Sequence, residues 1–217
     1  MPRTADIPPA YLLDRYRTWR RTRFEPDHAW YARLAREGQR PRAMVIACCD
    51  SRIDPTALFG GEPGDLFVVR NVAGLVPPFA PDHAHHGTSA AVEFAVCVLK
   101  VAHIVVLGHS NCGGVAACHD MCSGERETPG SFISRWIDIL RPGYERLDPS
   151  LDTREARLAA LEREGVLVSL RNLESFPFVE EALKRGELSL HGGWIDIGAG
   201  ALHAFDRTSR RFSPVPD

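Results

Sequence analysis

The sequence has neither a strong excess of charge of one sign nor a long apolar run. Its 217 residues include 26 lysines and arginines against 28 aspartates and glutamates, so the formal net charge is −2. A chain without excess positive charge has no general attraction to nucleic acid or to an anionic membrane. No apolar stretch approaches the roughly 20 residues that a membrane-spanning helix needs. We therefore expect no nucleic-acid partner and no membrane partner.

An export signal is also lacking, because the first 13 residues contain no apolar core of the kind that secretory signals carry. We therefore expect a cytoplasmic protein. In a reducing compartment the six cysteines serve as thiols or metal ligands rather than as disulfides. The chain shows no internal repeat or low-complexity tract, and it is long enough for one sizeable hydrophobic core.

Short apolar runs alternate with helical patterns along the chain, which is typical of an α/β fold. These patterns predict strands at 43–47, 66–69, 103–107, 194–197 and 202–205, and helices at 6–36, 55–60, 88–100, 112–121, 131–140, 153–173 and 177–184. We predict a mainly parallel central sheet flanked by helices, with an N-terminal helical arm and a late antiparallel edge strand, all in one domain over residues 1–217. In the helix at 88–100, Cys97 and Val98 are expected to face the core.

The arm, residues 1–38, combines aromatic residues with a row of arginines. Tyr11, Tyr16 and Trp19 share one helical stripe, and Trp30 and Tyr31 share another. Because these helices have little core of their own, we expect the arm to pack on a partner subunit. The arginines leave a nucleic-acid role open, although a solvated or partner-docked helix face is the more common use of such charge.

Cysteine and histidine follow two of the predicted strands. Cys48 comes directly after the run at 43–47, and His109 and Cys112 come after the run at 103–107. The carboxyl ends of parallel strands meet at one edge of a sheet, where such folds bind their ligands. The i, i+3 spacing lets the first turn of a helix bring His109 and Cys112 to one face, and a helix N-terminus favours the thiolate of Cys112. Gly113 and Gly114 leave this turn free of side chains.

Two sulfurs and one imidazole form a set of three ligands suited to Zn²⁺, with a fourth position open to water or substrate. We therefore predict a catalytic zinc site on Cys48, His109 and Cys112. A closed structural site is the alternative, but such sites usually show paired C-x₂-C spacings. Asp50 is either a fourth ligand or the acceptor of a hydrogen bond from zinc-bound hydroxide, and Arg52 is expected to hold it in a charge-assisted pair.

Other cysteines and histidines leave alternatives open. Cys118 and Cys122, spaced i, i+4, form either an ordinary packing pair or part of a second metal or redox cluster. His83, His85 and His86 lie in a loop predicted at 74–87. They are either solvated residues or carriers of protons, since histidine titrates near neutral pH.

The motif C-x-D-x-R at Cys48, Asp50 and Arg52, followed by H-x-x-C at His109 and Cys112, resembles that of the β-class carbonic anhydrases. The resemblance covers residues 39–197. It implies an enzyme with one Zn²⁺ per chain that reversibly hydrates carbon dioxide to bicarbonate and a proton, by attack of zinc-bound hydroxide. It also implies a homodimer as the building block of larger homo-oligomers.

Within this family, the chain is similar to a plant-like subgroup that carries a glutamine nine positions before the first cysteine. Gln39 stands at that position. The resemblance implies that Gln39 donates a hydrogen bond to the substrate across the dimer interface. Phe67, Val72 and Phe94 match the apolar substrate pocket of the subgroup, with Phe94 in place of the plant tyrosine, and Gly113 is assigned to the same pocket.

The other subgroup of the family builds a regulatory bicarbonate site from a tryptophan, a tyrosine and an arginine. This chain has Val45 and Ile195 where the tryptophan and tyrosine would stand. We therefore predict that the regulatory site is absent, that the zinc is open at neutral pH, and that Arg70, which matches the arginine, is structural.

Two other functions remain open at this point. A hydrolase of carbon disulfide or carbonyl sulfide on the same scaffold would use the same ligands, and rates on the three substrates would distinguish it. A non-catalytic zinc-binding interaction protein or redox sensor would bind metal without turnover.

Overall fold

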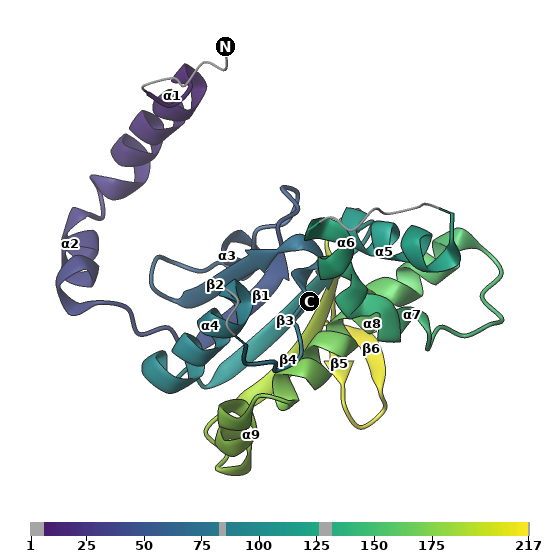
Figure 1. Ribbon diagram of the computed structural model, residues 1–217. Coiled ribbons are helices and arrows are strands. Elements are labelled where there is room, and N and C mark those ends of the chain that lie inside the picture. The colour runs from purple at the N-terminus through teal and green to yellow at the C-terminus, as the bar shows by residue number, and fades with distance from the viewer. Residues whose placement is uncertain (1–6, 83–85, 126–131, 217) are drawn as a thin grey trace. The chain divides into compact units, whose positions relative to one another are not determined.

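The structure is a computed structural model that describes residues 7–82, 86–125 and 132–216 (Figure 1). The chain forms two compact units, residues 1–39 and 40–217, so the division falls one residue after the predicted arm. No helix within the described ranges is long and apolar enough to cross a membrane.

The first unit consists of three consecutive helical segments. α1 (Ala10–Trp19) continues into a π-helical turn, η1 (Arg20–Phe24), and α2 (His28–Glu37) follows. None of the residues in these segments is buried. The ring centroid of Phe24 lies 5.7 Å from that of Trp19 and 5.1 Å from that of Tyr31, which makes a small aromatic cluster. Short helices with so little burial gain most of their stability from packing against something else.

The second unit contains a six-stranded sheet in the order β2-β1-β3-β4-β5-β6. Its strands are β1 (Ala43–Cys48), β2 (Leu66–Asn71), β3 (His103–His109), β4 (Ser189–Asp196), β5 (Ala201–Asp206) and β6 (Arg211–Pro214). The first four in spatial order pair in parallel, whereas β5 and β6 are added antiparallel at one edge. The predicted fold class, a mainly parallel sheet with a late antiparallel edge, is confirmed.

Helices and short turns of helix connect the strands. They are α3 (Pro55–Leu58), η2 (Val72–Gly74), α4 (Gly87–Glu93), η3 (Phe94–Leu99), α5 (Gly113–Ser123), α6 (Phe132–Ile137), η4 (Asp138–Leu140), α7 (Arg141–Tyr144), α8 (Arg154–Glu174) and α9 (Pro177–Lys184). α3 begins as the sequence predicts, because the Asp54 side chain caps it by accepting a hydrogen bond from the Thr56 N–H.

The main hydrophobic core lies between the sheet and the helices α4, η3, α8 and α9. Met44, Ile46 and Ile104 of the sheet are fully buried there. Each such side chain contributes about 1.5–3 kcal/mol of hydrophobic free energy relative to its exposed state. A second cluster joins α5, η4 and α8 beside the end of β1, and it includes Cys48 and Cys112.

The helical segment 87–99 shows one departure from the sequence prediction. Cys97 and Val98 were expected in the core, but both are exposed, Val98 to 61%. The second half of the segment, η3, is π-helical. A π turn contains more residues than an α turn, which shifts the inward-facing positions. Val96 is therefore buried in place of Cys97 and Val98.

The strands near the C-terminus show further departures. β4 begins at Ser189 rather than at residue 194, and β6 was not predicted. Glycine is a poor strand former, so the sequence around Gly192 and Gly193 does not predict a strand, although β4 runs through both residues. Packing explains the first of them: a Cβ on Gly192 would lie 3.0 Å from Cγ1 of Val166 on α8.

Candidate metal centre

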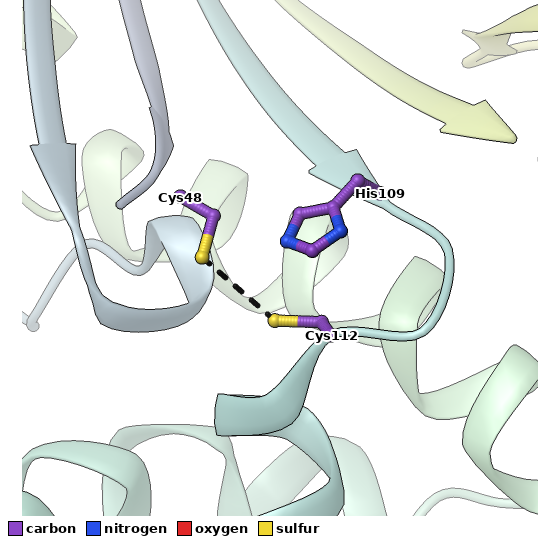
Figure 2. Close-up of side chains that lie close together, drawn as sticks. All are labelled: Cys48, His109 and Cys112. Atoms are coloured by element: carbon purple, nitrogen blue, oxygen red, sulfur yellow. Dashed lines mark hydrogen bonds between the residues drawn. The ribbon is translucent and has the colours of Figure 1, made fainter. Parts of the chain in front are cut away.

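Three potential metal ligands converge at the carboxyl edge of the sheet. Cys48 is the last residue of β1 and His109 is the last residue of β3, and these strands are parallel neighbours. Cys112 immediately precedes α5. The ligand atoms of the three residues all lie within 4.8 Å of one another, and all three residues are buried. Figure 2 shows their side chains pointing toward one another, with His109 and Cys112 at the two ends of one short loop and Cys48 opposite them.

The turn between β3 and α5 places Cys112 back beside Cys48. Asn111 takes a left-handed conformation there, with φ of 56°, which asparagine tolerates better than most residues. Gly114 lies so close to η2 that a Cβ would be 2.7 Å from Cγ1 of Val72. A Cβ on Gly113 would meet nothing within 4 Å. The turn is therefore packed on the Gly114 side and open on the Gly113 side.

His109 is held in the tautomer that a metal ligand requires. Its Nδ1 lies 2.9 Å from the carbonyl oxygen of Ser110, to which it donates a hydrogen bond. Its Nε2 is buried and has no hydrogen-bond partner in the part of the chain that the structure describes. A buried acceptor without a partner is costly, and a bound cation would satisfy it. The histidine therefore fits a metal ion.

The two sulfurs also fit one ion. Cys48 Sγ and Cys112 Sγ are 3.9 Å apart, and two sulfurs bound to zinc at about 2.3 Å in tetrahedral geometry would be about 3.8 Å apart. The hydrogen bond from Cys112 lowers the pKa of Cys48 to about 4. The same shared bond raises the pKa of Cys112. With only protein groups present, one thiol ionises at the expense of the other, whereas a divalent cation would favour both thiolates.

Asp50 lies beside these residues as a firmly held carboxylate. Arg52 donates to it from the backbone N–H at 3.0 Å, from Nε at 2.9 Å and from Nη2 at 2.7 Å. These bonds hold the pKa of the Asp50 carboxyl well below its usual range. Asp50 Oδ2 is 4.0 Å from His109 Nε2, and Arg52 also donates to the carbonyl oxygen of Asn111. The pair expected from the sequence is present, and it faces the three ligands.

Arg70 braces the loop that carries Cys48 and Asp50. Its guanidinium donates to the carbonyl oxygens of Cys48, Asp50 and Ile53 at 2.7–2.9 Å. All of these acceptors are backbone atoms. The contacts therefore agree with the structural role predicted for Arg70.

Glu162 is a site residue that the sequence analysis did not identify. It lies on α8, is only 6% exposed, and accepts hydrogen bonds from the Cys112 N–H and the Trp194 indole N–H, both at 3.2 Å. Burial raises the pKa of its carboxyl. One sequence signal was available: Glu162 is an acidic residue spaced i, i+4 and i, i+7 with Val166 and Ser169, both of which are buried.

The predicted substrate-pocket residues fall into two places. Val72 follows β2 and lies beside Gly114 near the ligands. Phe67 pairs with Met44 in the sheet register, four residues before Cys48, which is about 13 Å along the strand. Its ring centroid is 5.9 Å from that of Phe94. Phe67 and Phe94 therefore pack against each other. Phe67 lies toward the opposite end of the sheet from the metal ligands of the same chain. Gln39 belongs to the first unit.

The remaining cysteines and histidines lie elsewhere. Cys118 and Cys122 have their sulfurs 3.9 Å apart on α5, and burial raises the pKa of Cys118. His86 forms a hydrogen bond with Asp82, with Nε2 2.7 Å from Oδ1. Two members of the predicted histidine group, His83 and His85, lie outside the described residues.

Comparison with known proteins identifies the family. A family model described as carbonic anhydrase matches residues 43–202 of the chain. The solved β-carbonic anhydrase CcaA aligns with a TM-score of 0.82 and 30% identity, over 95% of this chain and 92% of that one. This chain belongs to the β-carbonic anhydrase family.

Two further relatives agree with this assignment. A carbonic anhydrase of Pseudomonas aeruginosa is 38% identical over 202 residues, which cover 93% of this chain and 89% of the relative. A β-carbonic anhydrase of Sordaria macrospora, described as tetrameric, aligns with a TM-score of 0.77 and 31% identity, over 89% of this chain and 94% of that one. Carbonic anhydrases are lyases, so the chain is an enzyme of that class.

Proposed function

We propose that this enzyme catalyses the reversible hydration of carbon dioxide to bicarbonate and a proton, with one Zn²⁺ per chain on Cys48, His109 and Cys112. The observation that carries the proposal is the convergence of two sulfurs and an imidazole whose buried Nε2 has no partner among the described residues. Bound there, Zn²⁺ would lower the pKa of water from 15.7 towards about 7 and so supply hydroxide near neutral pH.

Asp50 acts as a hydrogen-bond acceptor at this site. Because Arg52 holds its pKa low, Asp50 is ionised at neutral pH and has no proton to donate. It therefore accepts from an O–H group and turns the lone pairs of that oxygen toward the substrate. The alternative role of Asp50, as a fourth ligand, requires it to weaken its two-point contact with Arg52. The open arrangement is therefore favoured at neutral pH.

Carbon dioxide is small and apolar, so it needs a dry slot beside the ion. Val72 and the open space at Gly113 supply the near side of this slot. We propose that Phe67, Phe94 and Gln39 serve the site of a second subunit, since Phe67 lies about 13 Å along the strands from Cys48 of its own chain and the Phe94 ring packs beside it. Gln39 then donates a hydrogen bond to a substrate oxygen as charge develops there.

A homodimer, or a larger homo-oligomer built from dimers, follows from this arrangement. The arm, which buries none of the residues described in its helices, supports it, as does the relative described as tetrameric. We also propose that the enzyme works in the cytoplasm, where its thiolate ligands stay reduced.

Stopped-flow hydration of carbon dioxide, on protein whose zinc content is measured, tests the proposed function. We expect activity to rise in proportion to zinc content, to disappear on chelation and to return when zinc is restored. Activity that does not follow zinc content would contradict the proposal. Parallel assays with carbon disulfide and carbonyl sulfide should give much lower rates; a preference for either would replace carbon dioxide as the substrate.

A further inference from the structure

Glu162 occupies an unusual position for an acidic side chain. It is buried on α8, at 6% exposure, within hydrogen-bond distance of Cys112 at the metal centre and of Trp194 in the sheet. A buried carboxylate is retained only where hydrogen bonds compensate its desolvation. Oε1 accepts from the Cys112 N–H, and Oε2 accepts from Nε1 of Trp194. The backbone N–H of Asn111 is a further donor that favours the charged carboxylate.

These two bonds join three elements at one point. Cys112 immediately precedes α5, Trp194 is on β4, and Glu162 is on α8. Trp194 is itself fixed, because the guanidinium of Arg163 lies 3.9 Å from the centroid of its ring. One oxygen of Glu162 is therefore held in place by Trp194, and the other accepts a hydrogen bond from the backbone of Cys112, a proposed metal ligand.

We propose that Glu162 is a positioning residue that sets the direction of the Cys112 sulfur through the Cys112 N–H. The inference rests on the proposed zinc site. Mutation of a residue that hydrogen-bonds to a metal ligand typically lowers metal affinity by about 10- to 100-fold. Here the held atom is a backbone N–H rather than a side chain, so the effect reaches the sulfur through the Cα–Cβ bond of Cys112.

The substitution Glu162→Gln tests this proposal. Glutamine keeps the size of the side chain but replaces one acceptor oxygen with an NH₂ group. This NH₂ group must face either the Cys112 N–H or the Trp194 indole N–H, and two donors repel each other. We expect zinc affinity, measured by competition with a chromophoric chelator, to fall about 10- to 100-fold. In the cobalt-substituted protein, the sulfur-to-metal absorption bands should shift, because the Cys112 sulfur changes its angle. A purely structural role would lower the thermal stability of the metal-free protein without moving these bands.

A second substitution supplies the matched control. Trp194→Phe removes the indole donor and leaves the Cys112 N–H with its acceptor, so zinc affinity should change by less than about 3-fold. In the double variant Glu162→Gln/Trp194→Phe, the indole N–H is gone. The amide can therefore point its NH₂ group toward residue 194 and accept the hydrogen bond from the Cys112 N–H with its oxygen. The double variant should therefore recover zinc affinity and the cobalt bands. If Glu162→Gln alone does not fold, the double variant compared with Trp194→Phe provides the same test.

Two results would overturn the proposal. One is an unchanged zinc affinity and cobalt spectrum in Glu162→Gln. The other is a loss in Glu162→Gln that the second substitution does not restore, since the effect would then not pass through the Cys112 N–H. Failure of the zinc site itself is distinguishable, because the unmodified protein would then bind no zinc.

Discussion

At the scale of single residues, the site depends on which groups can accept and which can donate. His109 donates a hydrogen bond from Nδ1–H to the carbonyl oxygen of Ser110, and its buried Nε2 then carries a lone pair without a partner among the described residues. Asp50 is held ionised by Arg52 and has no proton to give. These two facts suit the neighbouring groups to different tasks: His109 would bind the proposed ion, and Asp50 would accept a hydrogen bond from a group bound to it.

The ligand assignment predicts that Cys48→Ser loses zinc and activity together. A serine hydroxyl is a much weaker zinc ligand than a thiolate, so the ligand set becomes incomplete. Zinc per chain, measured by atomic emission after dialysis, should fall to near zero, as should carbon dioxide hydration. Cys122→Ser is the matched control, since its sulfur lies near Cys118 rather than at the site, and it should keep both. Stoichiometric zinc in Cys48→Ser would refute the assignment.

For Asp50→Asn, zinc should stay bound while turnover falls by about 100-fold, within the range usual for loss of one preorganised hydrogen-bonding group. The amide presents a donor where the carboxylate accepted, and it pairs less well with Arg52. Stopped-flow rates at a fixed zinc content measure the effect, with Asp120→Asn as a control away from the site. Full activity in Asp50→Asn would remove Asp50 from the mechanism.

At the scale of elements, the site depends on how closely α5 approaches η2. Gly114 allows this approach because it has no Cβ, whereas the neighbouring Gly113 faces open space. With α5 in this position, the Cys112 sulfur lies 3.9 Å from the Cys48 sulfur. Adding even one methyl group at Gly114 is therefore expected to move the Cys112 sulfur.

Gly114→Ala should therefore destabilise the protein by about 1–3 kcal/mol, as overpacking does elsewhere. The new Cβ would lie 2.7 Å from Val72 and 3.0 Å from Ala73. Gly113→Ala is the matched control and should change the free energy of unfolding by less than about 0.5 kcal/mol. Urea unfolding of the two metal-free variants makes the comparison, and equal stabilities would show that the contact with η2 is not tight.

Much of the element order could be predicted from the sequence, because runs such as residues 43–47 are apolar and rich in strand formers. The predicted strands and the residues that follow them place Cys48, His109 and Cys112 at one edge of the sheet from sequence alone. The start of β4 could not be predicted, since Gly192 is required by its close packing on Val166 of α8, a contact that no local sequence pattern shows. Glu162 was not identified for the same reason: its partner Cys112 is fifty positions away. Tertiary contacts, rather than local pattern, decide such residues.

At the scale of the whole molecule, the chain supplies only part of the proposed pocket. Phe67 and Phe94 contact each other at a distance from the ligands, and Gln39 belongs to a unit whose helices bury none of their described residues. A symmetric dimer would place each of these groups at the site of the other subunit. The complete active site then belongs to two chains.

A mixing experiment tests this arrangement. Gln39→Ala should lose turnover while it keeps zinc, and Cys48→Ser should lose both. A dimer that combines the two variants contains one site with intact ligands and, from the other subunit, an intact Gln39. Co-expressed and separately tagged chains should therefore show activity above the sum of the two homodimers. If the mixture shows only that sum, Gln39 acts within its own chain or not at all.

The central claim is that two sulfurs and one imidazole nitrogen hold a zinc ion with one position left open. X-ray absorption at the zinc edge, on the purified full-length enzyme at neutral pH, tests it most directly. We predict two sulfurs at about 2.3 Å, one nitrogen at about 2.0–2.1 Å and one further light atom. This further atom should be replaced when an anion such as azide is added. A spectrum with three or four sulfurs, a fourth position that no anion displaces, or protein that retains no zinc would contradict the account.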